Sequence, residues 1–344
     1  MPRFKRRLTE PLPNPERNSM RKISIFLAII LLFLSLVSCS SALTPAPEEE
    51  NTKESSTQAL TKDDAKEDGK KILQESDPAE DDVINVLMIG SSSCYYYVEE
   101  LHGIAKAAGI NMKVCNVYYS GCTLKQHWTW WKLNESHYEY FETDENGRRR
   151  VLNLTNLKTC LVQENWDMIS FQQRIRDTAG DLEKAKSTYY RYLSDLYEYV
   201  SGQFPQSKYY WHDTWAYQIG YDRNGFVVDS AEKQAEMASW SKNFAIAVCQ
   251  DYPLTRVPGS DAWQYARQDA RVGDVLCNRG AKSDLYHDGE EGGGQYLNGC
   301  VWFETLTGKS CIGNTYRPDT YNLSEDKIAA LQEAAHRAVE ESRA

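Results

Sequence analysis

Val86-Leu-Met-Ile-Gly90-Ser-Ser-Ser-Cys94 is a run of large apolar residues that passes directly into a glycine and three hydroxyl side chains. The apolar part predicts a strand over 83–89 that is buried on both faces, because the run is continuous rather than alternating and has the length of a strand. The glycine and serines predict a tight turn, which leaves hydroxyl groups at the carboxyl end of this strand.

Strand-length apolar runs alternate with amphipathic stretches along the rest of the chain. Further strands are expected over 113–118, 166–171, 208–211 and 254–257, and helices over 98–108, 182–200, 230–252, 261–272, 294–306 and a last stretch capped by Ser324. The polar stretch 134–153, with a turn at Asp144-Glu-Asn-Gly147, predicts a hairpin or surface excursion. The pattern predicts an α/β fold class, a three-layer α/β/α sandwich with a central parallel sheet. Reactive groups in such sheets gather at the carboxyl ends of the strands.

The N-terminal part predicts where the protein is found. Arg21-Lys22 precedes an apolar run over 23–37 that is short for a membrane span, and Leu36-Val37-Ser38-Cys39 resembles the bacterial lipobox. We therefore expect residues 1–39 to be a signal peptide with its lipobox, and the mature protein to start at a lipidated Cys39, anchored to the membrane on its extracytoplasmic side. An uncleaved anchor helix is the alternative, and it gives the same location.

The chain after the lipobox divides into two parts. Residues 40–83 hold 13 acidic and 5 basic residues and almost no large apolar residue. Such a composition cannot bury enough surface to fold, so we expect a disordered acidic linker. Residues 84–344 have the length of one domain.

Composition limits the classes of partner. The chain has 39 Lys and Arg against 49 Asp and Glu, a net charge of −10. This balance excludes nucleic acid, and a polyanionic ligand unless it is compensated locally. The 22 Tyr and 9 Trp fit either sugar stacking or an ordinary core.

Besides Cys39 there are eight cysteines without zinc-like spacing. We interpret them mostly as buried free thiols, with a Cys300–Cys311 disulfide left open. We expect a monomer.

Two short segments carry candidate chemistry. The turn at Ser91, Ser92 and Ser93 supplies hydroxyls, and Asp284-Leu-Tyr-His287 places an aspartate and a histidine on one loop late in the chain. A serine, then an aspartate and a histidine, is the outline of a serine hydrolase, in which the histidine activates the hydroxyl and the aspartate orients the histidine. His212, beside Asp213, is a rival base, and Asp288 is a rival orienting acid.

Five blocks in this order resemble the SGNH (GDSL-type) hydrolase superfamily, and within it a bacterial branch described as DUF4886. They are Ile89-Gly-Ser-Ser-Ser-Cys94, Tyr119-Ser-Gly-Cys122, Trp166-Asp-Met-Ile-Ser-Phe-Gln-Gln173, Trp211-His-Asp-Thr-Trp-Ala-Tyr217, and the stretch from Asp284 to Gly308. The resemblance covers nearly all of 84–344 and implies a flavodoxin-like α/β/α domain.

The resemblance also implies roles for single residues. Ser92 matches the nucleophile, with Ser91 and Ser93 as neighbours that compete for this role, while His287 and Asp284 match the base and its orienting acid. Gly121 matches the glycine whose N–H binds the oxyanion. The family's third block ends in Gly-x-Asn, whereas this chain has Gln172 and Gln173, so either one glutamine amide replaces the asparagine or both are merely polar residues at a strand end.

The function implied is an extracytoplasmic serine esterase that removes acetyl groups from a glycan through an acyl-enzyme. This chemistry needs no metal or organic cofactor. The alternative from another class is a non-catalytic lipoprotein that binds a glycan or surface on the same fold, and the altered third block motivates it.

Overall fold

The computed structural model describes residues 83–280 and 283–344. The expected signal peptide with Cys39, and all of the expected linker except residue 83, lie outside the described residues. Within the described ranges, no helix combines the length and the apolar character that crossing a membrane requires.

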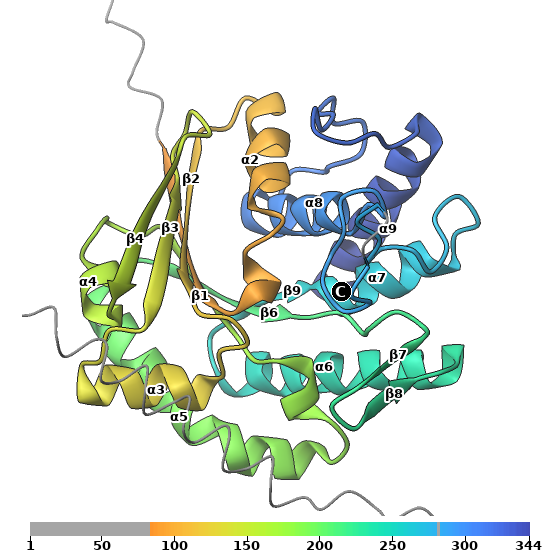
Figure 1. The fold of residues 1–344 in the computed structure, drawn as a ribbon. Coiled ribbons are helices and arrows are strands. Elements are labelled where there is room, and N and C mark those ends of the chain that lie inside the picture. The colour runs from red at the N-terminus through yellow and green to blue at the C-terminus, as the bar shows by residue number, and fades with distance from the viewer. Residues whose placement is uncertain (1–82, 281–282) are drawn as a thin grey trace, which may run out of the picture. The chain divides into compact units, whose positions relative to one another are not determined.

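A seven-stranded sheet with the order β4-β3-β2-β1-β5-β6-β9 forms the centre of the domain (Figure 1). Strands β2, β1, β5, β6 and β9 are parallel, and the antiparallel pair β3 and β4 extends the sheet beyond β2. The strands are β1 (Ile84–Gly90), β2 (Met112–Tyr118), β3 (Tyr138–Thr143), β4 (Arg149–Thr155), β5 (Met168–Gln172), β6 (Lys208–Asp213) and β9 (Thr255–Pro258). The short β7 (Tyr221–Arg223) and β8 (Phe226–Val228) form a separate hairpin.

Helices cover both faces of the sheet, as the sequence predicts. Val86 and Met88 of β1 pack in one apolar cluster, and Leu87 and Ile89 pack in the other, because successive side chains of a strand point to opposite faces. The first cluster contains α2 (Val98–Ala107), α7 (Gly259–Gln268), α8 (Gly294–Thr307) and α9 (Glu325–Arg343). The second contains α3 (Leu124–Leu133), α4 (Leu157–Leu161), α5 (Leu182–Gln203) and α6 (Ala231–Asp251) (Figure 1).

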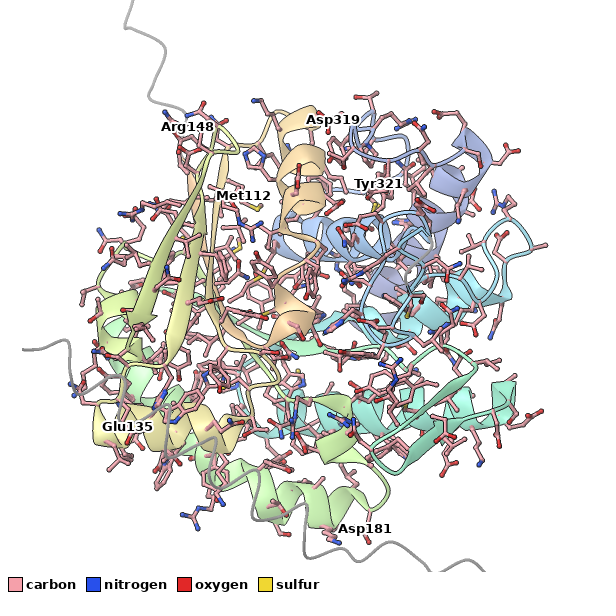
Figure 2. The ribbon with its side chains drawn as sticks, in the orientation of Figure 1. Met112, Glu135, Arg148, Asp181, Asp319 and Tyr321 are labelled. Carbon is pink, nitrogen blue, oxygen red and sulfur yellow. The ribbon has the colours of Figure 1, made fainter. Side chains whose placement is uncertain are left out.

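The predicted α/β sandwich is confirmed, and it differs from the prediction only in detail: α4 and the β7–β8 hairpin were not predicted, for example. The stretch 134–153 is a hairpin as expected, but its strands join the central sheet, which is therefore mixed rather than purely parallel. Asp144 closes the turn of this hairpin by accepting the N–H groups of Asn146 and Arg148, and Figure 2 shows Arg148 at its tip. The sequence analysis missed α3, although Thr123 and Gln126 form a capping box at its start.

The cysteines in the described residues are free thiols, most of them buried, in line with the interpretation from sequence. Cys300 of α8 and Cys311 lie close enough for their thiol groups to interact, and both are free.

Helices α2 and α8 approach each other closely at Gly299. A Cβ atom at this position would lie 2.9 Å from Cβ of Glu100 and 3.0 Å from the backbone nitrogen of Leu101. Only glycine fits this approach without displacing a backbone. The contact matters for the site described below, because α2 follows the serine turn and α8 follows the loop that holds His287.

We predict that Gly299→Ala destabilises the domain by about 1–3 kcal/mol, because the added methyl group forces α2 and α8 apart. Gly202→Ala is the matched control, since a Cβ at this helical position of α5 meets nothing within 4 Å. That change should be neutral or stabilise by up to about 1 kcal/mol. Urea unfolding of the three proteins measures both effects, and equal stability of the two variants would contradict the close-contact interpretation.

Candidate active site

The serine turn begins where β1 ends. Ser92 opens a single turn of 3-10 helix, η1 (Ser92–Cys94), and the neighbouring strand β5 supports the residue before it. The N–H of Ser91 donates to Oε1 of Gln172 at 3.3 Å, and Nε2 of Gln172 donates to Oγ of Ser91 at 3.1 Å. A Cβ on Gly90 would lie 2.5 Å from Oε1 of this glutamine, so glycine is needed for the amide to come this close. The turn is therefore held rigidly against β5.

The loop with Asp284 and His287 is fixed from the other side of the site. The indole N–H of Trp215 donates to the carbonyl oxygen of Tyr286 at 3.0 Å, and the N–H of Gln218 donates to the carbonyl oxygen of Leu285 at 2.8 Å. Leu285 has a φ of 64°, an unusual backbone conformation for leucine. The segment after β6 thus holds the loop over the carboxyl end of the sheet.

Ser92, His287 and Asp284 form a continuous hydrogen-bonded series. His287 Nε2 lies 3.0 Å from Oγ of Ser92, and His287 Nδ1 lies 2.5 Å from Oδ2 of Asp284. Since an ionised carboxylate only accepts hydrogen bonds, Nδ1 carries the proton, and Nε2 is left as the atom that accepts the serine proton. The structure therefore brings together the three residues that the sequence analysis selected.

Asp284 is held in its ionised form. Burial acts to raise its pKa, but hydrogen bonds from the ring and the backbone N–H of His287, and from the N–H of Tyr286, outweigh it and lower the pKa to about 2. The negative charge is available to orient His287 and to stabilise its protonated form.

A pocket of about 60 Å³ lies beside the series. Ser92, Gly121 and His287 line it, together with Trp215 and Tyr217 of the fourth sequence block. The lining also includes residues that the sequence analysis did not assign to the site: Arg174, Ile175, Arg176, Thr214 and Tyr286. The hydroxyl of Thr214 is buried there without a partner among the described residues. Arg174 and Thr214 could have been found by the rule that identified Gln172, because each closely follows a parallel strand.

The two residues whose backbone N–H groups are expected to form an oxyanion hole, Ser92 and Gly121, line the same pocket. Gly121 has a φ of 63°, which suits glycine, and it faces the same pocket as Ser92. Among hydrogen bonds between backbone groups of the described residues, none uses the N–H of Ser92 or of Gly121. Both N–H groups are therefore free to donate a hydrogen bond to a ligand in the pocket.

The two glutamines are differently placed. Gln172 supports Ser91, as described above. Gln173 donates from Nε2 to Asp177 at 3.2 Å and accepts the N–H of Leu124, at the start of α3, at 2.9 Å. Neither side chain lines the pocket. Each amide therefore makes hydrogen bonds that support the structure. An oxyanion role for one of the two glutamines stays a prediction.

The rival residues lie outside the hydrogen-bonded series. His212 is buried among Tyr97, Trp215 and Trp302, and burial lowers its pKa to about 3. Asp288 is fully buried, and its side chain accepts from Nδ2 of Asn298 at 3.1 Å rather than from His287. Ser91 and Ser93 line the pocket, but the hydroxyl that meets His287 is that of Ser92.

One group of potential metal ligands occurs in the described ranges, away from this pocket. Glu304 of α8 and His336 and Glu340 of α9 have ligand atoms within 4.8 Å of one another. Each carboxylate already has protein partners: Glu304 accepts the N–H of Cys311, and Glu340 pairs with Arg343. His336 Nδ1 lies 2.5 Å from Oε1 of Glu304, so the group is explained as a link between the two helices.

We predict that Asp288 makes stability depend on pH. Burial raises its pKa to about 6, whereas an exposed aspartate titrates near 4. The folded state therefore binds this proton more tightly than the unfolded state, and folding loses stability as the pH rises from about 4 through about 6. Asp288→Asn removes the cost of ionising a buried carboxyl group. The free energy of unfolding of the variant should therefore rise by up to about 2 kcal/mol relative to that of wild type between about pH 4 and about pH 6. Parallel stability curves for the two proteins, measured by urea unfolding at pH 4, 5, 6 and 7, would contradict this assignment.

Comparison with known proteins gives one family match. The family described as "Domain of unknown function (DUF4886)" matches residues 85–338. No curated protein matches the chain.

Several solved structures are similar. A DUF4886 family protein from Bacteroides uniformis is 27% identical, with 75% of this chain and 95% of that chain covered and a TM-score of 0.66. A putative GDSL-like lipase from Parabacteroides merdae is 15% identical over 66% of this chain and 96% of its own, with a TM-score of 0.44. An acetyl xylan esterase is 11% identical over 65% of this chain and 100% of its own, with a TM-score of 0.42. The family match spans nearly the whole described domain and confirms the branch expected from the sequence blocks: the chain belongs to the DUF4886 family.

Proposed function

We propose that this protein is an extracytoplasmic serine esterase, anchored as a lipoprotein, that removes acetyl groups from a glycan. The observation that carries the proposal is the hydrogen-bonded series from Ser92 through His287 to Asp284, with distances of 3.0 and 2.5 Å. A serine hydroxyl is a poor nucleophile until a base takes its proton, and this series supplies both the base and the acid that orients it.

In the first half of the reaction, Oγ of Ser92 attacks the ester carbonyl carbon while Nε2 of His287 takes the hydroxyl proton. The N–H groups of Ser92 and Gly121, both uncommitted, donate to the oxyanion of the tetrahedral intermediate. His287 then gives the proton to the departing alcohol oxygen as the C–O bond breaks. Asp284 stays ionised throughout, which its low pKa permits.

In the second half, water replaces the alcohol. His287 takes a proton from water, the hydroxide attacks the acyl carbon, and Ser92 leaves with the proton returned by His287. The products are a free carboxylic acid and the regenerated enzyme. Every proton in this cycle passes through the one histidine.

The substrate class is supported by the size and lining of the pocket. About 60 Å³ beside Ser92 accommodates a small acyl group such as acetyl more readily than a long chain. Tyr286 lines the pocket and is partly exposed, and an aromatic side chain of this kind can stack on a sugar ring.

A second candidate is a non-catalytic glycan-binding protein on the same fold. It is favoured by the third block, where the amides of Gln172 and Gln173 both have protein partners in place of the usual asparagine donor. Losing one oxyanion donor typically costs about a hundredfold or more in rate. Labelling of Ser92 by a fluorophosphonate, mapped by mass spectrometry, would count against this candidate.

Hydrolysis of 4-nitrophenyl acetate by residues 84–344 tests the esterase directly. We expect Ser92→Ala and His287→Ala each to lower kcat by about a thousandfold or more, because each removes a member of a unit that acts together. Asp284→Asn should lower kcat by about ten-thousandfold with little effect on KM, because an asparagine at this position holds His287 in the wrong tautomer.

Ser93→Ala and Asp288→Asn are the matched controls. Both residues are next to a member of the series without belonging to it, so both variants should keep turnover within about tenfold of wild type. Equal inactivity of wild type, Ser92→Ala and His287→Ala would favour the binding protein instead. A greater loss in Ser93→Ala than in Ser92→Ala would move the nucleophile to Ser93.

The membrane anchor is tested on the full chain expressed in a bacterium. We expect wild type to appear in the membrane fraction with a diacylated N-terminal Cys39, because two acyl chains hold a protein stably on a bilayer. Cys39→Ser should lose the lipid modification seen by mass spectrometry. Membrane association of both forms without lipid would point to the uncleaved anchor helix.

A further inference from the structure

Two arginines line the pocket beside Ser92. Arg174 and Arg176 both come from the segment after β5, where η2 (Ile175–Thr178) begins. Within the described parts of the chain, no aspartate or glutamate side chain lines this pocket. The chain has a net charge of −10, but the arginines that line this pocket make its charge locally positive.

Arg174 is held by one carboxylate and still has a free edge. Its Nε and Nη2 donate to the two oxygens of Asp177 at 2.7 and 2.9 Å, which fixes the plane of the guanidinium group. The remaining nitrogen, Nη1, lies 3.6 Å from the position that a Cβ on Gly121 would occupy. The free N–H groups of Arg174 are therefore on the same side of the pocket as the expected oxyanion donor.

Arg176 has no carboxylate partner among the described residues. Its Nε is buried and makes no hydrogen bond within them, and its guanidinium group lies over the ring of Phe226, 5.8 Å from the centroid. A buried donor without a partner is uncommon in folded proteins, because the lost hydration is not replaced. A ligand group that accepts hydrogen bonds would supply the missing partner.

The pairing of the two arginines favours an anion. Asp177 binds Arg174, whereas Arg176 has no carboxylate partner among the described residues. The planar fork of arginine matches a carboxylate, with two N–H groups directed at two oxygens. We infer that the ester hydrolysed at Ser92 belongs to a molecule that carries a carboxylate close to the ester, such as an acetylated uronic acid unit of a glycan, and that Arg176, with the free edge of Arg174, binds this carboxylate. The inference rests on the proposed function and deepens it.

The test compares substrates that differ only in charge. Methyl galacturonoside and methyl galactoside, each carrying one acetyl group at the same hydroxyl, differ at C6, where one has a carboxylate and the other a CH₂OH group. We expect kcat/KM of wild type to be on the order of 10- to 100-fold higher for the charged ester, the usual contribution of a hydrogen bond to a charged group. The preference should shrink as salt is added. A 6-O-sulfated galactoside ester tells whether a sulfate is accepted in place of the carboxylate.

Arg176→Gln should lower the ratio of kcat/KM values for the charged and the neutral ester toward one. Arg176→Lys keeps the positive charge but loses the planar guanidinium group, so this variant should retain part of the preference for the charged ester. Arg191→Gln is the matched control, because this arginine is exposed on α5 and stacks over Trp128 and Tyr192 instead of lining the pocket. Its ratio should equal that of wild type. A wild-type ratio near one, or the same ratio in Arg176→Gln, overturns the inference.

Binding separates this inference from the proposed function. With Ser92→Ala, calorimetry is expected to show tighter binding of methyl galacturonoside than of methyl galactoside, and Arg176→Gln should remove the difference. If wild type hydrolyses 4-nitrophenyl acetate but shows no preference for the charged sugar, the proposed esterase function is supported and the carboxylate site is overturned. Preferential binding of the uronoside without any hydrolysis would support the carboxylate site and overturn the esterase.

Discussion

The contact between α2 and α8 is the constraint on which the site depends. These two helices follow the two segments that must meet, the turn with Ser92 and the loop with His287, which lie 195 residues apart in the chain. The absence of a side chain at Gly299 lets the helices approach at backbone distance. A displacement of about one ångström between them would lengthen a 3.0 Å hydrogen bond beyond the range in which a proton is transferred. Close packing far from the pocket thus sets the geometry inside it.

The surroundings of two neighbouring aspartates shift their pKa values in opposite directions. Asp284 receives three hydrogen bonds from the loop that it shares with His287, and its pKa falls to about 2. Asp288 is next to the same histidine, but it is fully buried with one amide donor, and its pKa rises to about 6. Two aspartates four positions apart therefore differ in function because one is hydrogen-bonded in a turn and the other is desolvated.

Much of the fold could be predicted from the sequence, because the relevant signals are local. The run Val86–Ile89 is apolar on both faces and therefore indicated a strand between two helical layers, which the two clusters confirm. Helix α3 was missed even though Thr123 and Gln126 mark its start, since its three tryptophans obscure a helical period. The polar character of stretch 134–153 indicated a hairpin, but nothing local revealed that β3 would pair with the edge of the sheet beside β2. Strand pairing across the sheet depends on which edge is free after the other strands have assembled.

By itself, the sequence determined the candidates: a serine turn after a buried strand, an aspartate and a histidine at the spacing of one loop, and a glycine after the second strand. Such features depend on neighbouring residues, and a linear pattern records them. Only the tertiary structure decided which of three serines meets His287, that His212 is enclosed by aromatic rings, and that Gln172 and Gln173 support the turn and α3. It also placed Arg174 and Arg176 beside Ser92. Side-chain direction at a strand end depends on packing and hydrogen-bond partners contributed by distant segments, so these choices are made when the chain folds.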